Sequence, residues 1–277
     1  MQEMGLSGVM VGKYEVENTD VDDNSRKLAK VIEDGDLVLA VGGDATAVIG
    51  TNGILLSEKD ATLAVLPYGN FNDLSRTLKT KTLKDVFKGK TQKLWPLEIV
   101  IDDKQFRFAT CYVTIGMTAE AVELFDDKKV RARLQKGHKS SWRSYPQLAK
   151  WYFKNRHKRV FIPEFKLNGE PKHRKTSDYA AVNGRSMAKV MRGGEWFLAS
   201  EGFLSETGRL TNFWRLAVLM TKSILHRVPG EVTKNDVLEF SAPAAVEIQA
   251  EGEYKRFENI RKIEIKKAKK CLKVITN

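Results

Sequence analysis

Two short apolar segments, each followed at once by a glycine-containing loop, constrain the fold of this chain more than any other feature. Residues 36–43, DLVLAVGG, and residues 61–69, ATLAVLPYG, each have the length of one buried strand. Apolar strands that alternate with helical segments are typical of a parallel sheet covered by helices. Residues 22–34 and 45–49 have helical patterns, and residues 8–14, GVMVGKY, have a strand pattern. The first ninety or so residues therefore predict an α/β domain.

The pattern changes after the segment KLWPL, residues 93–97. Residues 97–113 alternate apolar and polar side chains, Asn168–Gly169 is a strong two-residue turn signal, and residues 244–267 are again strand-like. Helices are expected near Thr118–Arg133 and Arg215–His226. We therefore expect an α/β first domain over residues 1–94 and a β-rich sandwich over residues 95–277. We also expect the C-terminal tail to return to the first domain.

Composition narrows the class of protein. A chain of 277 residues with 42% hydrophobic content can form a large core, and its two cysteines, Cys111 and Cys271, have neither disulfide-framework nor zinc-site spacing. The longest apolar stretch, Phe213–Leu225, is shorter than a bilayer span and contains two basic residues. The N-terminus has no apolar core of the signal-peptide type. We expect a cytoplasmic protein.

The charge balance favours anionic partners. The formal net charge is +12 and the pI is about 9.5, which fits nucleic acid, an anionic membrane surface or a phosphorylated small molecule. Basic residues concentrate in Lys128–Arg159, where aromatic residues interleave with them, and in the tail Arg261–Lys270. Such a segment fits a membrane surface or a nucleic-acid surface, but an ordinary helix with buried aromatic residues explains it equally well.

The two glycine loops carry the candidate chemistry. Both follow strands of one predicted parallel sheet, so both face the same edge, where helix N-termini favour anions. The first loop contains Asp44 and the second contains Asp73, and two carboxylates near a phosphate site suit a magnesium-nucleotide complex. No Walker or protein-kinase pattern is present. Alternatively, Asp44 or Thr46, and Asn72 or Asp73, only cap helices after glycine turns.

These loops and the segments after them resemble the diacylglycerol kinase catalytic-domain family of lipid kinases, which is related to the NAD kinases and sphingosine kinases. Residues 41–46, VGGDAT, are similar to the family's Gly-Gly-Asp-Gly-Thr, and residues 66–78, LPYGNFNDLSRTL, to its second motif. The segments FATCYVTIGMTAEAV, YAAVNGRSM, FLSETGRL and VEIQAEGE follow in the family's order. The resemblance implies an N-terminal nucleotide domain, a C-terminal sandwich, and an interdomain site for ATP and Mg²⁺.

The resemblance also implies roles for individual residues. Asp44 matches the aspartate beside the ATP phosphates, Asp73 the aspartate of the second loop, and Glu253 the proposed base toward the lipid hydroxyl. Glu206 stands where the family has a carboxylate of a structural metal site. The cofactor-binding residues implied are Gly42, Gly43 and Thr46 in the first loop and Gly69 and Asn72 in the second. Without the resemblance, Glu253 would be taken as a solvated turn residue.

The chain departs from the family pattern at several places. Ala45 replaces a glycine, and its methyl group stands where backbone approaches phosphate. Asn70 and Phe71 make the second loop bulkier, and Glu206–Thr207 replaces an Asp-Asp pair. Near residue 98 the usual aspartate is missing, with Glu98 close by. We also expect that the family's opening strand has no counterpart.

The sequence therefore predicts an ATP- and Mg²⁺-dependent lipid kinase that phosphorylates a diacylglycerol-type hydroxyl at an anionic membrane surface, as a peripheral protein and with a homodimer as one option. A catalytically impaired member that keeps nucleotide or lipid binding is the first alternative. An NAD kinase-like enzyme is the second, because that group shares the first motif. A nucleic-acid-binding module is the third, although it leaves both glycine loops unexplained.

Overall fold

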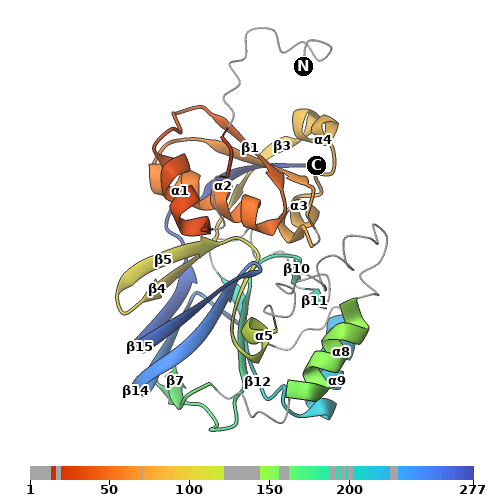
Figure 1. Ribbon diagram of the computed structural model, residues 1–277. Helices are drawn as coiled ribbons and strands as arrows, with labels where there is room; N and C mark the ends of the chain where they lie inside the picture. The colour runs from red at the N-terminus through yellow and green to blue at the C-terminus, as the bar shows by residue number, and fades with distance from the viewer. Residues whose placement is uncertain are drawn as a thin grey trace.

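The chain forms two domains, each built on its own sheet, as the computed structural model shows (Figure 1). The structure describes residues 14–16, 20–69, 71–121, 144–155, 162–187, 191–192, 194, 198, 202–224 and 230–277. The strand expected over residues 8–14 therefore lies almost wholly outside the described residues. Most of the basic segment from Lys128 to Arg159 also lies outside them.

The first domain contains a four-stranded sheet in the order β1-β2-β16-β3. Its strands are β1 (Leu37–Gly42), β2 (Thr62–Pro67), β3 (Lys90–Leu94) and β16 (Leu272–Thr276). β1 pairs parallel with β2 and β2 pairs parallel with β16, whereas β3 is antiparallel to β16. The last strand of the chain thus lies inside the first sheet, between β2 and β3, and its Val274 is fully buried.

Four helices accompany this sheet: α1 (Val21–Ala29), α2 (Asp44–Ser57), α3 (Asp73–Leu78) and α4 (Leu83–Lys88). Asp20 begins α1, because its side chain accepts hydrogen bonds from the N–H groups of Asp22 and Asp23. Thr82 and Asp85 form a capping box that begins α4. α2 is apolar on all sides and is buried from Ala47 to Leu55, since it lies between the first sheet and the second domain.

The second domain contains a ten-stranded sheet, whose main path is β13-β12-β9-β6-β14-β15-β4-β5, with β7 and β8 attached to β14. Its strands are β4 (Leu97–Ile101), β5 (Lys104–Ala109), β6 (Tyr112–Gly116), β7 (Phe165–Leu167), β8 (Glu170–Pro171), β9 (Asp178–Val182), β12 (Phe203–Gly208), β13 (Glu231–Thr233), β14 (Asn235–Ala250) and β15 (Glu253–Lys267). All pairings between the described strands of this sheet are antiparallel. The expected fold class, an α/β domain followed by a β-rich domain, is confirmed.

The long strands let this sheet bend around one core. β14 pairs with β7 through residues 238–240 and with β6 through residues 248–250, and its register against β15 shifts between Glu239 and Val246. Bulges of this kind bend a strand and increase its twist. Side chains from β4, β7, β9 and β12 therefore share one hydrophobic cluster, although these strands are not all hydrogen-bonded neighbours.

Three hairpin turns of the second domain have residues with positive φ. Asp102–Asp103 joins β4 to β5, Asn168–Gly169 joins β7 to β8, and Glu251–Gly252 joins β14 to β15. Two consecutive positive φ values are the geometry of the tight hairpin turn that Asn-Gly favours. The Asn168–Gly169 turn is the one that the sequence predicts. The Glu251–Gly252 turn places a carboxylate at the first turn position.

The remaining described elements are α5 (Met117–Glu120), α8 (Ser144–Asn155), α9 (Phe213–Ile224) and a short pair of strands, β10 (Ser186–Met187) and β11 (Met191–Arg192). The helix expected over Thr118–Arg133 is described as α5 only, and the one expected over Arg215–His226 begins two residues earlier, at Phe213. Within the described residues, no helix combines the length and the hydropathy that a bilayer crossing requires.

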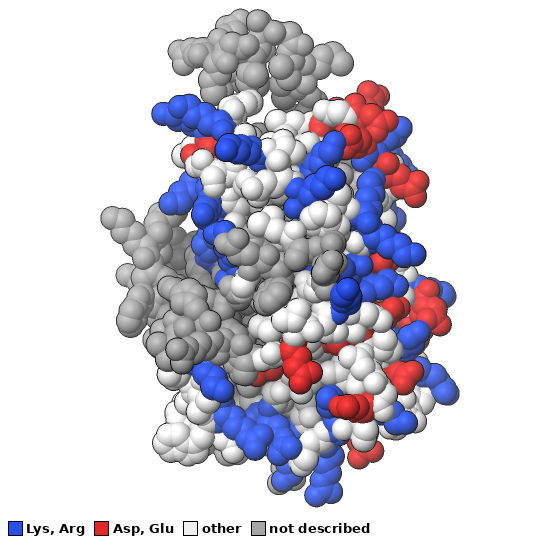
Figure 2. Space-filling view, turned by 180° about the vertical axis from the view of Figure 1, so that it is seen from behind, with Lys and Arg blue, Asp and Glu red and all other residues white. Residues whose placement is uncertain are grey.

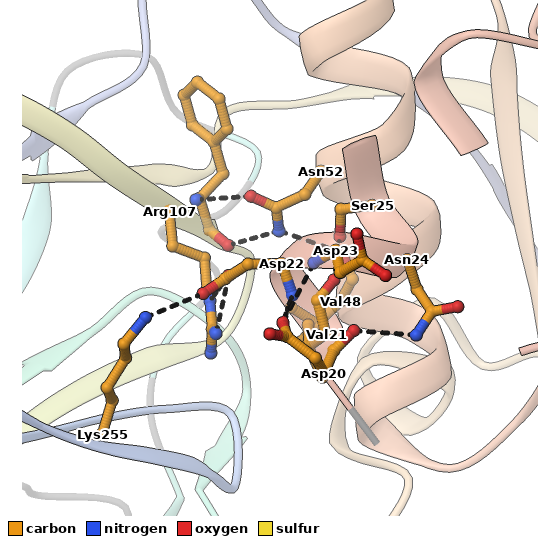
Figure 3. Close-up of polar contacts among 11 residues, drawn as sticks. Asp20, Val21, Asp22, Asp23, Asn24, Ser25, Val48, Asn52, Arg107 and Lys255 are labelled. Carbon is orange, nitrogen blue, oxygen red and sulfur yellow. Dashed lines mark hydrogen bonds and ion pairs between the residues drawn. The ribbon is translucent and has the colours of Figure 1, made fainter. Parts of the chain in front are cut away.

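A polar seam joins the two domains between α1, α2 and β5 (Figure 3). Asp22 Oδ1 accepts hydrogen bonds from Arg107 Nε at 2.9 Å and Nη2 at 2.7 Å, while Lys255 Nζ lies 3.3 Å from Asp22 Oδ2. Asn52 in α2 donates to the backbone oxygen of Phe108 and accepts from its N–H. Arg107 is almost fully buried. These bonds fix the first domain against the edge of the second sheet.

Candidate active site between the two domains

The two glycine loops pack against each other, backbone to backbone. A Cβ added to Gly69 would lie 2.3 Å from the Cα of Gly43, a distance that real Cβ atoms do not show. Gly42 lies beneath the side chain of Thr46 in the same way, since a Cβ there would lie 2.2 Å from Thr46 Oγ1. Glycine is therefore needed at these positions for loop packing, independently of any ligand.

Asp44 joins the two loops. Asp44 is the first residue of α2. The N-cap of this helix is Gly43, and not Asp44 or Thr46 as the sequence suggested. Its carboxylate accepts hydrogen bonds from Asn72 N at 2.9 Å and from Asp73 N at 2.7 Å, so it caps the N-terminus of α3 from another element.

The second loop is closed by Asn72. Its side chain accepts from Gly69 N at 2.9 Å and donates to Gly69 O at 2.6 Å. Asn72 itself has a positive φ of 53° and makes no side-chain bond into α3. Asn70, one of the departures from the family pattern, lies outside the described residues. Asn72 therefore shapes the loop, while Asp44 performs the capping.

Asp44 and Asp73 form a pair of close acids. Asp73 is 1% exposed and pairs with Arg76, whose Nη1 also donates to Phe71 O. Burial, followed by the charge of Asp73, raises the pKa of Asp44 to about 6, against the opposing effect of its two backbone hydrogen bonds. A like charge and loss of water both disfavour the ionised carboxylate. A cation or a magnesium-bound phosphate beside Asp44 would relieve both effects.

Glu251, which the sequence reasoning missed, brings a third carboxylate from the second domain. Its Oε1 accepts from Thr110 Oγ1 and from the N–H of Cys111, and the residue is 3% exposed. Burial is the main cause that raises its pKa to about 7, and the charge of Asp44 contributes to the rise. Glu251 is therefore electrostatically linked to the first domain's acids. The signal was present, because Glu251 occupies the first position of Glu-Gly-Glu, where the related pattern has aspartate.

We call Asp44, Asp73 and Glu251 the acid cluster. Tyr112 and Cys111 lie beside it. Both are buried, and burial with the charges of the neighbouring carboxylates raises the pKa of each above its ordinary value. Thr77 Oγ1 of α3 lies 3.9 Å from Cys111 Sγ. The cluster thus spans the domain boundary: two acids come from the first domain and one from the second.

The remaining candidate residues are distributed differently. Glu253 begins β15 two positions after Glu251 and pairs in register with Ala250; it is half-buried, and its convergence with Asp44 stays a prediction. Glu206 lies on β12, where burial and the charge of Asp178 raise its pKa to about 7 while Lys222 acts in the opposite direction. Asp178 is itself buried, with a pKa raised to about 7 by burial, and accepts from Thr118 N at 2.8 Å.

The described residues contain no group of three or more His, Cys, Asp or Glu side chains arranged to hold a metal ion. This does not exclude Mg²⁺ chemistry, since Mg²⁺ is commonly bound through one or two carboxylates together with substrate phosphates and water. Asp44 and Asp73 fit that donor set, because they are close acids whose charges disfavour each other. Glu98 lies on β4 in the second sheet, opposite Lys266 and Phe108 in register.

Comparison with known proteins gives one family match and several similar folds. Residues 6–98 match the family model of the diacylglycerol kinase catalytic domain. No curated protein matches the sequence. A crystal structure of a diacylglycerol kinase from Bacillus anthracis strain Sterne matches with a TM-score of 0.63 and 16% identity, covering 95% of this chain and 84% of that one. A second structure from the same strain also gives a TM-score of 0.63, with 17% identity over 94% of this chain and 84% of that one.

The resemblance read from the sequence is thus confirmed at two levels. The sequence match covers both glycine loops and ends at β4, while the similarity in fold covers nearly the whole chain. Residues 6–98 thus match the diacylglycerol kinase catalytic-domain model, and the fold of both domains is similar to that of diacylglycerol kinase structures.

Proposed function

We propose that this protein transfers the γ-phosphoryl group of ATP to the hydroxyl group of a diacylglycerol-type lipid, at the acid cluster between its domains. The observation that carries the proposal is the convergence of Asp44, Asp73 and Glu251 from two domains on one buried region. Neighbouring acids with raised pKa values, such as Asp44 and Glu251, are a typical sign of a functional site. The match of residues 6–98 to a kinase domain supports the reaction type.

The nucleotide would bind on the first domain. α2 has no side-chain hydrogen bond at its N-terminus, because its N-cap is glycine, so its first-turn N–H groups and its positive dipole end are suited to phosphate. Asp44 and Asp73 would hold Mg²⁺ through carboxylate oxygens, and the ion would supply charge compensation for the phosphates. Arg76 holds Asp73 in place.

Glu251 is the best-supported base. A lipid alcohol is a weak nucleophile and requires a group that accepts its proton. The pKa of Glu251 is raised to about 7, near the operating pH at which a general base is most effective. Thr110 Oγ1 and the N–H of Cys111 both donate to Oε1, and the backbone of Thr110 also interacts with this carboxyl group, so these bonds hold the side chain in place. Glu253, the base implied by the family resemblance, serves as the matched comparison.

The test is transfer of labelled phosphate from Mg-ATP to a short-chain diacylglycerol in mixed micelles, with NAD as a second acceptor. Glu251→Gln should lower kcat by about 10²- to 10⁴-fold, and Glu253→Gln should leave most activity intact. Asp44→Asn should weaken Mg-ATP binding in a calorimetric titration, whereas Glu251→Gln should not.

The outcomes separate the alternatives. Mg-ATP binding without turnover in the unmodified protein would replace the proposal with a catalytically impaired member. Phosphorylation of NAD but not of lipid would replace it with an NAD kinase-like enzyme. A loss of turnover in Glu253→Gln but not in Glu251→Gln would return the base to Glu253.

A further inference from the structure

We propose that helices α8 and α9 together form a membrane-docking surface that binds anionic bilayers through exposed aromatic side chains surrounded by lysine and arginine. This inference deepens the proposed function, because a lipid kinase must reach a substrate embedded in a bilayer. The surface consists of four apolar residues, Phe153, Phe213, Trp214 and Val218, and four basic ones, Lys150, Lys154, Arg215 and Lys222. We call it the α8–α9 surface.

The aromatic residues of this surface form one continuous group across two helices. The ring centroids of Phe153 and Phe213 lie 5.6 Å apart, and those of Phe213 and Trp214 also lie 5.6 Å apart. The exposed fractions are 46% for Phe153, 40% for Phe213 and 76% for Trp214. Three large rings that contact each other and face solvent are unusual for a surface that binds nothing, since exposed aromatic residues normally occur singly.

The opposite faces of these helices explain why the aromatic residues are not simply core. Tyr152 of α8 and Leu219 of α9 are buried in one hydrophobic cluster, and Leu216 of α9 packs against that cluster. Other apolar residues of α9 therefore form the face that packs against the core, and Phe213 and Trp214 are not needed there. Trp214 and Val218, spaced by four residues, lie on the outer side of the same helix.

The positive charge of the α8–α9 surface favours an anionic partner. Neither α8 nor α9 contains an acidic residue, and each carries two basic ones, all four of which are exposed. Aromatic residues flanked by lysine and arginine match a bilayer interface, where rings enter the headgroup region and cations meet anionic headgroups. Lys222 also lies close enough to Glu206 to oppose the rise in its pKa, so it serves both groups.

The other basic segment is a weaker candidate because its cations already have protein partners. Within Arg261–Lys270, Lys262 Nζ donates to Asp103 at 2.9 Å, Lys266 Nζ to Glu264 at 3.3 Å and Lys270 Nζ to the backbone oxygen of Lys59 at 3.2 Å. Figure 2 likewise shows Asp and Glu side chains among the Lys and Arg side chains of that view. The α8–α9 surface instead combines four exposed basic side chains, on two helices without an acidic residue, with exposed rings.

The position of the surface suits the proposed reaction. α8 and α9 lie side by side at the margin of the second domain (Figure 1). α9 contacts β11, β11 pairs with β10, and β10 contacts α3, the helix that begins with Asp73. A bilayer docked on α9 would therefore lie on the side of the molecule that leads through β10 and β11 to the acid cluster.

The test is sedimentation with lipid vesicles, using the full chain without nucleotide. Vesicles of phosphatidylcholine containing phosphatidylglycerol should bind the protein, vesicles of phosphatidylcholine alone should bind it weakly, and salt should reduce the binding. Trp214→Ser should lower the partition coefficient about tenfold, and Arg215→Gln should lower it about fivefold. Phe87→Ser, which changes an exposed aromatic residue on α4, is the matched control and should leave binding unchanged.

Fluorescence gives a second measurement. Vesicles should shift the tryptophan emission to shorter wavelength, and Trp214→Phe should abolish most of this shift while retaining binding. Equal binding of Trp214→Ser and the unmodified protein would overturn the proposal. So would tight binding of duplex DNA that Trp214→Ser and Arg215→Gln abolish, or a dimer in solution that Trp214→Ser converts to a monomer.

Activity separates this inference from the proposed function. Trp214→Ser should phosphorylate a dispersed short-chain diacylglycerol at the unmodified rate, but should be slower on diacylglycerol in vesicles. If vesicle binding depends on Trp214 and no lipid is phosphorylated, the docking surface stands and the proposed function fails. If Trp214→Ser acts equally on both substrate forms, the docking surface fails and the proposed function stands.

Discussion

The two domains meet at two polar contacts of different charge. The polar seam between α1 and β5 combines one carboxylate, Asp22, with two cations. The acid cluster, between the first turns of α2 and α3 and the turn after β14, combines three carboxylates. At the polar seam, Asp22 is matched by Arg107 and Lys255. At the acid cluster, Arg76 pairs with Asp73, while burial and neighbouring negative charge raise the pKa values of Asp44 and Glu251. A contact that only holds domains together has no need of unbalanced charge. The acid cluster is therefore the contact that is suited to a cation and a phosphate.

The largest expected effect tests the polar seam. Asp22→Ala leaves the guanidinium of Arg107 buried without its carboxylate, and it should reduce the free energy of unfolding by about 3 kcal/mol. Asp23→Ala is the matched control, because Asp23 lies in the same helical turn and pairs with Lys27 at a more exposed site; it should cost about 0.5 kcal/mol. Chemical denaturation of both variants measures the difference. Equal losses of unfolding free energy in the two variants would mean that the polar seam does not stabilise the contact between the domains.

The next effect tests the backbone geometry of the acid cluster. Gly69→Ala forces a methyl group against the backbone of Gly43, so it should cost about 2 kcal/mol and weaken Mg-ATP binding. Gly43→Ala should cost less, because its Cβ would lie 3.2 Å from the Cα of Gly69. Unfolding and calorimetric titration of the two variants should show this order. The reverse order would mean that the loops do not pack as described.

The third prediction is a gain in stability, whereas the first was a loss. Burial raises the pKa of Glu251 from 4.5 to about 7, so the folded state holds its proton more tightly than the unfolded state. The stability that Glu251 contributes is therefore present below pH 4.5 and is lost as pH rises through 7. Glu251→Gln keeps an oxygen for Thr110 and Cys111 and should stabilise the protein at pH 8 by about 2 kcal/mol.

Unfolding curves over a range of pH test this expectation. The advantage of Glu251→Gln should shrink as the pH falls from 8 and disappear below pH 4.5, where the carboxyl group of the unmodified protein is protonated in both the folded and the unfolded state. Asp22→Ala should destabilise the protein at both ends of this pH range, because it removes the carboxylate that faces the buried guanidinium of Arg107. An advantage of Glu251→Gln that is independent of pH would show that the charge of Glu251 is not its cause.

Local pattern was sufficient to predict much of this architecture. The apolar runs of β1 and β2, the glycine loops after them and the Asn168–Gly169 turn are determined by neighbours in sequence, and each is found where the pattern indicates. The two motif aspartates also meet, because parallel strands end at the same sheet edge. These features depend on strand periodicity and turn chemistry, which a sequence displays directly.

The parts that were missed depend on contacts distant in sequence. Asp44 caps α3 across 28 residues, and Glu251 bonds to Cys111 across 140, so neither role is visible in local periodicity. Glu251 and Glu253 both fit an acid of a Glu-Gly-Glu segment. Only the hairpin distinguishes them, because the positive φ of Glu251 puts it in the turn, while Glu253 is already on β15. The sequence could supply the segment but not the choice between its two acids.

The smallest expected effect concerns Ala45, which replaces the family's glycine. Ala45 is the second residue of α2, and it is not among the described residues with positive φ. Its methyl group packs against the hydrophobic cluster that contains Ala47 and Val48, so alanine occupies an ordinary helical position here. Ala45→Gly should therefore cost about 0.5–1 kcal/mol of stability and should not improve Mg-ATP affinity. Ala149→Gly in α8 provides the same substitution far from the acid cluster, and both variants should lose similar stability. A calorimetric gain in Mg-ATP affinity for Ala45→Gly alone would show that the methyl group obstructs phosphate, and that this region of the acid cluster has departed from a working nucleotide site.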